Sequence, residues 1–178
     1  MRKRNNIIVL SLILAAMIAS GCGGSAQTAA SPASSISAGT EVRVPADGKE
    51  YLEVLKDIFH EYADSSFPLA DDLEAKNYDA AKKDLENMEA ALSKVETVTP
   101  PEQYADQQKK IVDSLVSERE YLNNCRKFIG YCEKGADRLT EDDIKEVQKL
   151  NKALEDAPAD FSNTYIEVFR TVKADIDN

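Results

Sequence analysis

The amino-acid sequence predicts an all-α fold, an antiparallel up-down four-helix bundle, and three observations support this expectation. Apolar residues in the segment 47–178 recur mostly at spacings of three and four, the period of an amphipathic helix. The same segment is rich in Ala, Leu, Glu and Lys, and its only glycines are Gly48, Gly130 and Gly135. Short connections join the four helical segments, so consecutive helices are expected to pack as antiparallel neighbours.

The first helix is expected to run from Asp47 to about Lys76. Its apolar side chains form one stripe, made of Tyr51, Leu55, Ile58, Tyr62, Leu69 and Leu73. Pro68 interrupts this stripe, and proline lacks the backbone N–H that a helix interior uses. We therefore expect this helix to be kinked or broken at Pro68, with Ser65 or Ser66 capping a continuation.

The second helix is expected over residues 78–95. Its apolar positions alternate at spacings of three and four without interruption: Tyr78, Ala81, Leu85, Met88, Leu92 and Val95. The sequence therefore predicts a continuous helix here.

The third helix is expected to begin after Thr99 and to end at Gly135. Thr99 can cap the helix, Pro100 suits the first helical position, and Glu102 completes a capping box. The expected core positions are Tyr104, Gln108, Ile111, Leu115, Glu118, Leu122, Cys125, Ile129 and Cys132. Gly135 is a natural C-terminal stop because glycine adopts the left-handed conformation easily.

A second capping box, formed by Thr140 and Asp143, predicts the start of the fourth helix. The stripe of this helix contains Val147, Asn151, Leu154, Phe161, Tyr165, Val168, Val172 and Ile176. Pro158 also lies on the stripe, so we expect the fourth helix to be kinked or broken there.

Residues 1–21 have the pattern of a secretory signal peptide. Basic residues at positions 2–4 precede the apolar run 7–18, and small residues follow at positions 19–21. The run is shorter than the ~18 to 20 apolar residues that a membrane-spanning helix needs. A cleaved signal is therefore expected in preference to a permanent transmembrane helix.

The stretch Ala19-Ser20-Gly21-Cys22 resembles the lipobox of bacterial lipoproteins, with Ala19 at a position where leucine is usual. The resemblance implies cleavage between Gly21 and Cys22 and attachment of acyl chains such as palmitate to Cys22. It also implies a location at the cell membrane or outer membrane, facing outside the cytoplasm. The alternative is an ordinary secretory signal that leaves Cys22 as a free thiol.

The segment after Cys22 is expected to be a flexible tether extending to Ala46, before the bundle domain of residues 47–178. Residues 23–40 are mostly Gly, Ala, Ser and Thr and carry no charge. A flexible coil of this length has an r.m.s. span of about 25 to 30 Å. Residues 41–45 alternate apolar and polar side chains, which is compatible with an extended strip against the domain or with a loop.

The charge of the chain argues against a nucleic-acid partner. The formal net charge is −10, and removal of the three basic residues before Cys22 makes it −13. Such a surface repels phosphate backbones and anionic lipid headgroups. Membrane attachment is therefore expected through lipid on Cys22 rather than through surface charge.

Three polar residues, Gln108, Glu118 and Asn151, occupy positions on the apolar stripes. A buried carboxylate is costly unless it is paired, so these residues could line a small internal cavity or an open groove. Two alternatives are that Glu118 lies at the edge of the stripe and reaches water or Arg119, and that one polar layer sets the register of the bundle.

No metal site, cofactor or catalytic constellation is expected from the sequence. The chain has one histidine, His60, whereas di-iron bundles need two Glu-x-x-His units. Cys125 and Cys132 are about 10.5 Å apart along one helix face, which excludes a disulfide between them, and both are expected to be buried.

The expected function is that of a non-catalytic module that binds another protein or an envelope component. The alternative is a small-ligand-binding or sensory bundle with a pocket inside the bundle, near Glu118 and the kinks at Pro68 and Pro158. An enzyme, the third alternative, would need Glu118, His60 and a cysteine to converge.

Overall fold

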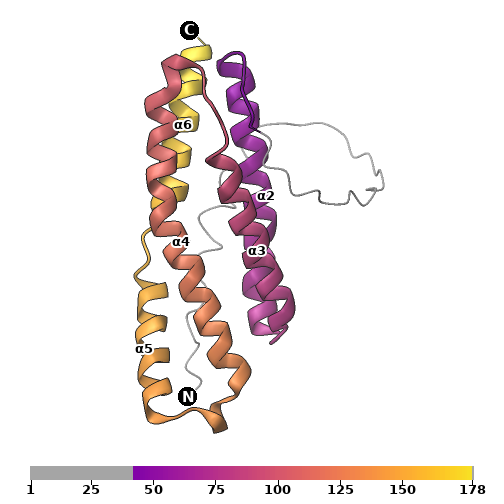
Figure 1. Cartoon of the computed structure of the whole chain (residues 1–178), viewed down its shortest axis with the longest axis vertical. Coiled ribbons are helices and arrows are strands. Elements are labelled where there is room, and N and C mark those ends of the chain that lie inside the picture. Colours follow the sequence, from indigo (N-terminus) through magenta and orange to yellow (C-terminus); the bar gives the residue numbers. More distant parts are fainter. Residues whose placement is uncertain (1–41, 178) are drawn as a thin grey trace, which may run out of the picture. The chain divides into compact units, whose positions relative to one another are not determined.

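The computed structural model describes residues 42–177, and within them four helical elements pack against one another without any strand, as predicted. Figure 1 shows α4 alongside α5 and α6, and α2 alongside α3. The predictions for the signal peptide, the cleavage site at Gly21 and Cys22, and most of the tether fall outside the described residues. The described chain is therefore all-α, with its fourth helix in two segments.

Helix α2, Gly48–Glu74, is continuous through Pro68, so a break at this residue is wrong. The Asp47 side chain caps the helix by accepting the Glu50 N–H at 2.9 Å. Tyr62 and Leu69 are buried on either side of Pro68. Burial of a large apolar side chain contributes about 1.5–3 kcal/mol, which offsets the cost of about 3 kcal/mol for proline inside a helix.

Helix α3, Tyr78–Val95, has the bounds predicted from the sequence. It follows α2 after a short turn in which Lys76 adopts a positive φ of 60°. The Lys94 ammonium group of α3 pairs with the Glu61 carboxylate of α2. These two helices therefore form an antiparallel hairpin.

The start of α4 differs from the prediction, because Thr99 does not cap it. The Thr99 N–H donates to the Arg43 carbonyl at 2.9 Å, and the Arg43 N–H donates to the Thr97 carbonyl at 3.2 Å. This bridge keeps the chain extended, and Pro101 is also extended, with ψ of 146°. A 3-10 turn, Glu102–Tyr104, then leads into α4, Ala105–Lys134.

The bridge also favours one of the two alternatives for residues 41–45, of which the structure describes 42–45. Arg43 lies as an extended strip against residues 97–99, and Pro45 is buried. The side chains of Val42 and Val44 remain exposed. Arg43 and Pro45 therefore already contact the bundle before the cap residue Asp47.

The fourth helix is broken at Pro158, one of the two expected outcomes. Its segments are α5, Glu141–Glu155, and α6, Asp160–Ile176. The predicted capping box is present, since the Thr140 hydroxyl accepts the Asp143 N–H and the Asp143 carboxylate accepts the Thr140 N–H. Gly135, with φ of 78°, ends α4 as expected.

Contacts between helices confirm the up-down order. Lys82, near the start of α3, pairs with Glu133, near the end of α4, at 2.5 Å. Lys110, near the start of α4, pairs with Glu167 of α6 at 3.1 Å. The chain therefore reverses direction between α3 and α4 and again between α4 and the fourth helix.

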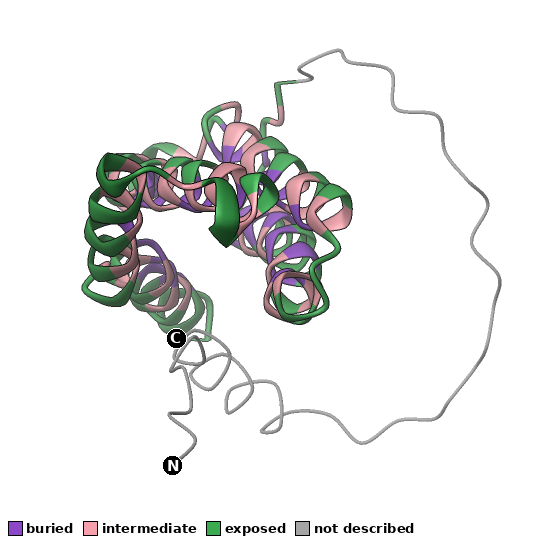
Figure 2. Cartoon of the chain, turned by 90° about the horizontal axis from the view of Figure 1, so that it is seen from below, coloured by how far each residue is buried: buried purple, intermediate pink, exposed green. Residues whose placement is uncertain are grey.

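The buried faces of the helices turn toward one another (Figure 2). The largest fully buried side chains are Tyr51, Phe161, Leu55, Ile58, Leu85, Met88, Leu92, Ile111, Leu115, Leu122, Ile129 and Val95. Helix α5 contributes only Leu150 to the buried residues. Cys125 is buried as expected, whereas Cys132 is only half-buried, because it lies in the last turn of α4.

Candidate functional site

Two of the three predicted polar core residues, Gln108 and Glu118, are buried on α4. The Gln108 carbonyl oxygen accepts the Tyr51 hydroxyl of α2 at 2.9 Å. The Gln108 amide donates to the Val95 carbonyl at the end of α3 at 2.6 Å. One buried amide therefore joins α2, α3 and α4, and its polar atoms are partnered.

Glu118 makes the second buried polar contact between α2 and α4. Its side chain accepts the hydroxyl of Tyr62, which is buried as well. Burial raises the pKa of Glu118, and the hydrogen bond from Tyr62 lowers it by a smaller amount. The two tyrosine pairs support the alternative of a polar layer that sets the register of the bundle.

Arg119 does not reach Glu118, so the alternative pairing considered from the sequence is wrong. Its guanidinium group binds the Glu96 carboxylate through two nitrogens at 2.8 Å and the Glu89 carboxylate at 2.9 Å. These hydrogen bonds direct Arg119 toward α3. The hydrogen bonds from Arg119 to Glu96 also lower the pKa of Glu96.

Asn151 does not belong to the core, which corrects the third prediction. It is half-exposed on α5, and its amide donates to Glu155 of the same helix at 3.1 Å. The principal neighbour of α5 is α4, so one narrow face of α5 is covered, and Leu150 occupies it. The three polar residues therefore do not form one cavity lining.

Near Glu118, α4 places two more titratable side chains, Tyr121 and Cys125. Both interact electrostatically with Glu118. Burial raises the pKa of the Cys125 thiol to about 12, and it also raises the pKa of the Tyr121 hydroxyl. A thiol with so high a pKa is a poor nucleophile at neutral pH.

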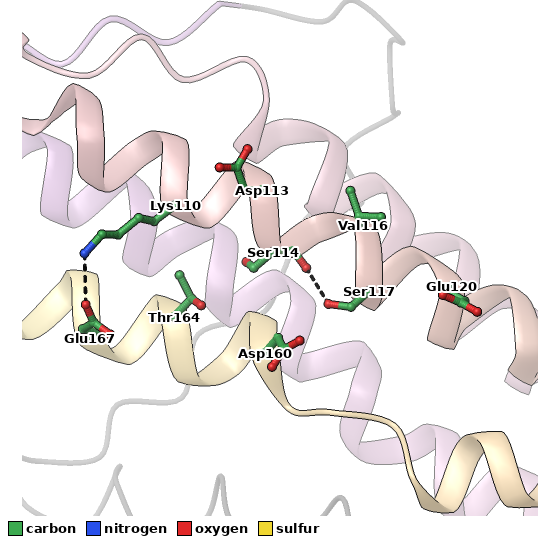
Figure 3. A pocket seen from close by; sticks show the side chains of 9 residues that line it. All are labelled: Lys110, Asp113, Ser114, Val116, Ser117, Glu120, Asp160, Thr164 and Glu167. Carbon is green, nitrogen blue, oxygen red and sulfur yellow. Dashed lines mark hydrogen bonds and ion pairs between the residues drawn. The ribbon is translucent and has the colours of Figure 1, made fainter.

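The structure reveals a surface groove between α4 and α6 that the sequence analysis did not predict (Figure 3). Its volume is about 620 Å³, and it is wide open to solvent. The lining residues are Lys110, Asp113, Ser114, Val116, Ser117, Glu120, Asp160, Thr164 and Glu167. The groove could have been anticipated from the sequence, because spacings of three and four among these residues place them on one face of each helix, beside the apolar stripe.

Negative charge predominates in the α4–α6 groove. Lys110 is its only basic residue and is paired with Glu167. Asp113 pairs with Lys109 at 2.5 Å, whereas Glu120 and Asp160 have no ion pair with any of residues 42–177. Val116 is 73% exposed at the groove, the most exposed large apolar side chain of the described chain. This surface therefore offers carboxylates, hydroxyls and one apolar contact.

The three residues that an enzyme was expected to bring together do not share one environment. His60 is exposed on α2, whereas Glu118 and Cys125 are buried. Between residues 42 and 177, no group of His, Cys, Asp and Glu side chains is arranged to hold a metal ion. None of the helices in that range has the length and apolar character required to cross a bilayer.

Comparisons with protein-family models, with curated proteins and with solved structures returned no match.

Proposed function

We propose that this protein is a membrane-anchored lipoprotein whose helical bundle acts outside the cytoplasm as a non-catalytic binding module for a protein or envelope component. The observation that carries the proposal is the lipobox-like stretch Ala19-Ser20-Gly21-Cys22, which follows a basic and then an apolar segment. Two or three acyl chains on Cys22 hold a protein stably on a membrane, at about 0.8 kcal/mol for each buried CH₂ group.

The surface of the bundle supports binding of a large partner. The α4–α6 groove is open and long enough to involve about three successive turns of α4, from Lys110 to Glu120. An extended or helical polypeptide can follow such a groove, whereas small ligands favour enclosed pockets. Inside the bundle, the polar groups of Gln108 are already partnered by Tyr51 and Val95, which favours a structural role for this residue.

Replacing Cys22 by Ala tests the anchor. We expect the variant to leave the membrane fraction and the detergent phase, because the acyl chains can no longer be attached. The measurement is fractionation of cells followed by detection of the protein in each fraction. The matched control is Cys132→Ala, which removes a thiol that the lipobox does not contain and leaves the protein membrane-bound. Retention of Cys22→Ala on the membrane would contradict lipidation at this residue.

Photo-cross-linking in intact cells tests the binding role. A photoreactive side chain placed at Val116, in the groove, is expected to give one discrete cross-linked species with a partner. The control position is Val44, which is also valine and is 67% exposed but lies in the strip beside residues 97–99. Equal cross-linking patterns from Val116 and Val44 would argue against the groove as the binding surface.

A further inference from the structure

Glu118 is a carboxyl group inside the bundle with no cation beside it. Its side chain is 8% exposed, and it forms no ion pair with the other described residues. The two arginines next in the sequence of α4 bind other groups: Arg119 binds Glu89 and Glu96, and Arg126 donates to the Leu85 carbonyl. The negative charge of an ionised Glu118 is therefore not neutralised locally.

The surroundings of Glu118 involve four helices, and the groups that interact with Glu118 itself carry no positive charge. On α2, Tyr62 donates its hydroxyl to Glu118. On α4, Tyr121 and Cys125 are the titratable neighbours. On α6, the Phe161 ring packs edge-on against the Tyr62 ring, with centroids 5.2 Å apart. On α3, Glu89 is bound by Arg119 at 2.9 Å.

Glu118 is the titrating carboxyl group among the groups that interact directly, because its partners are two tyrosine hydroxyls and one thiol. Burial raises the pKa values of the hydroxyls of Tyr62 and Tyr121 and of the Cys125 thiol, so all three stay neutral. Burial also raises the pKa of Glu118, because it disfavours the charged form more than the Tyr62 hydrogen bond stabilises it. A carboxyl group with this property takes up a proton more readily in the folded domain than in the unfolded chain.

We propose that the Tyr62–Glu118 contact is a pH-sensitive latch between α2 and α4, in which protonation of Glu118 tightens the bundle and loss of the proton loosens it. The hydrogen bond from Tyr62 is compatible with both states, since a protonated carboxyl group retains an accepting oxygen. The two states differ in free energy because the ionised carboxylate carries a charge in the interior of the bundle, whereas the protonated acid does not. Because Tyr62 also packs on Phe161, loosening at Glu118 reaches the first turn of α6, immediately after the break at Pro158.

The direction of the pH effect follows from the raised pKa. The unfolded chain titrates Glu118 near the ordinary value of about 4.3. Between that pH and the higher pKa of the folded state, the folded domain binds more protons than the unfolded chain. The stabilisation is therefore complete below the ordinary value and is lost as the pH rises through the pKa of the folded state. One proton corresponds to at most about a tenfold change in the folding equilibrium constant for each pH unit.

The test is urea unfolding of the full chain in detergent, followed by circular dichroism between pH 4.5 and 8. For Glu118→Gln we expect a weaker pH dependence and a higher unfolding midpoint than the unsubstituted protein at pH 8, because the neutral amide mimics the protonated acid. The matched control is Glu120→Gln, the same change on the exposed side of α4, which leaves the pH dependence as it is. An unchanged pH dependence in Glu118→Gln would overturn the proposal.

A second variant keeps the proposal testable if Glu118→Gln does not fold. Tyr62→Phe removes the hydrogen bond that favours the ionised carboxylate, so the pKa of Glu118 rises further. The loss of stability is then expected to extend to higher pH than in the unsubstituted protein. A uniform loss at every pH in Tyr62→Phe would show that the Tyr62 hydroxyl stabilises both charge states of Glu118 equally, and this result would reject the latch.

Discussion

Replacing Phe161 by Ala is expected to destabilise the domain by about 3–5 kcal/mol. The Phe161 side chain is 1% exposed and begins the buried face of α6. It packs against the rings of Tyr62, Phe59 and Tyr165, with centroids 5.2, 6.2 and 6.3 Å away. Truncation removes these contacts and leaves a cavity that rigid neighbouring helices fill only in part. Since domains are stable by about 5–15 kcal/mol, the loss is a large part of the total.

The control for Phe161→Ala is Phe67→Ala, the same substitution on α2 at a side chain that is 37% exposed. We expect this variant to lose less than half as much free energy of unfolding, because part of the Phe67 surface remains in contact with water in the folded state. The measurement is urea unfolding at constant pH. Equal losses in the two variants would contradict the assignment of Phe161 to the core that holds α6 in place.

The two prolines show what local sequence patterns leave undecided. Pro68 and Pro158 both lie within helical stripes, yet α2 continues through the first and the fourth helix breaks at the second. Around Pro68, buried side chains before and after the ring belong to one packed face. Pro158 stands between Ala157 and Ala159, which offer little apolar area to hold a continuous helix. Packing against other helices therefore decides the outcome at each proline.

Helix boundaries were predictable where their causes are local. The capping box of Thr140 and Asp143 and the stop at Gly135 depend on neighbouring residues, and both are confirmed. The start of α4 depends instead on Arg43, which pairs with Thr97 and Thr99 from more than fifty residues away in the sequence. No pattern within 99–105 contains that information.

For the three polar residues on the stripes, the sequence predicted burial correctly in two cases but not the partners of the buried residues. The stripe positions of Gln108 and Glu118 predicted burial, but their partners Tyr51 and Tyr62 are 57 and 56 residues away and looked like ordinary core aromatics. Asn151 has the same position on its stripe and is not buried, because α5 rests mainly on α4. Periodicity identifies the inward face of a helix, whereas the number of helices covering that face depends on the tertiary fold.

Replacing Gln108 by Ala is the second substitution with a large expected effect, a loss of about 3 kcal/mol in the free energy of unfolding. The change removes hydrogen bonds at 2.9 and 2.6 Å and leaves the Tyr51 hydroxyl and the Val95 carbonyl unpartnered inside the bundle. Each unpartnered buried group costs about 1–3 kcal/mol. Adding Tyr51→Phe to this variant removes one of the stranded groups, so the double variant should lose less than the sum of the two single changes.

The control for Gln108→Ala is Asn151→Ala, which also truncates an amide that belongs to an apolar stripe in the sequence. Its hydrogen bond to Glu155 is exposed, so water replaces the lost partner and the expected change is within about 0.5 kcal/mol. Both variants are compared by urea unfolding of the full chain at one pH. If Gln108→Ala were as mild as Asn151→Ala, the amide would not be the contact that fixes α2, α3 and α4 relative to one another, and the register of the bundle would have to depend on apolar packing alone.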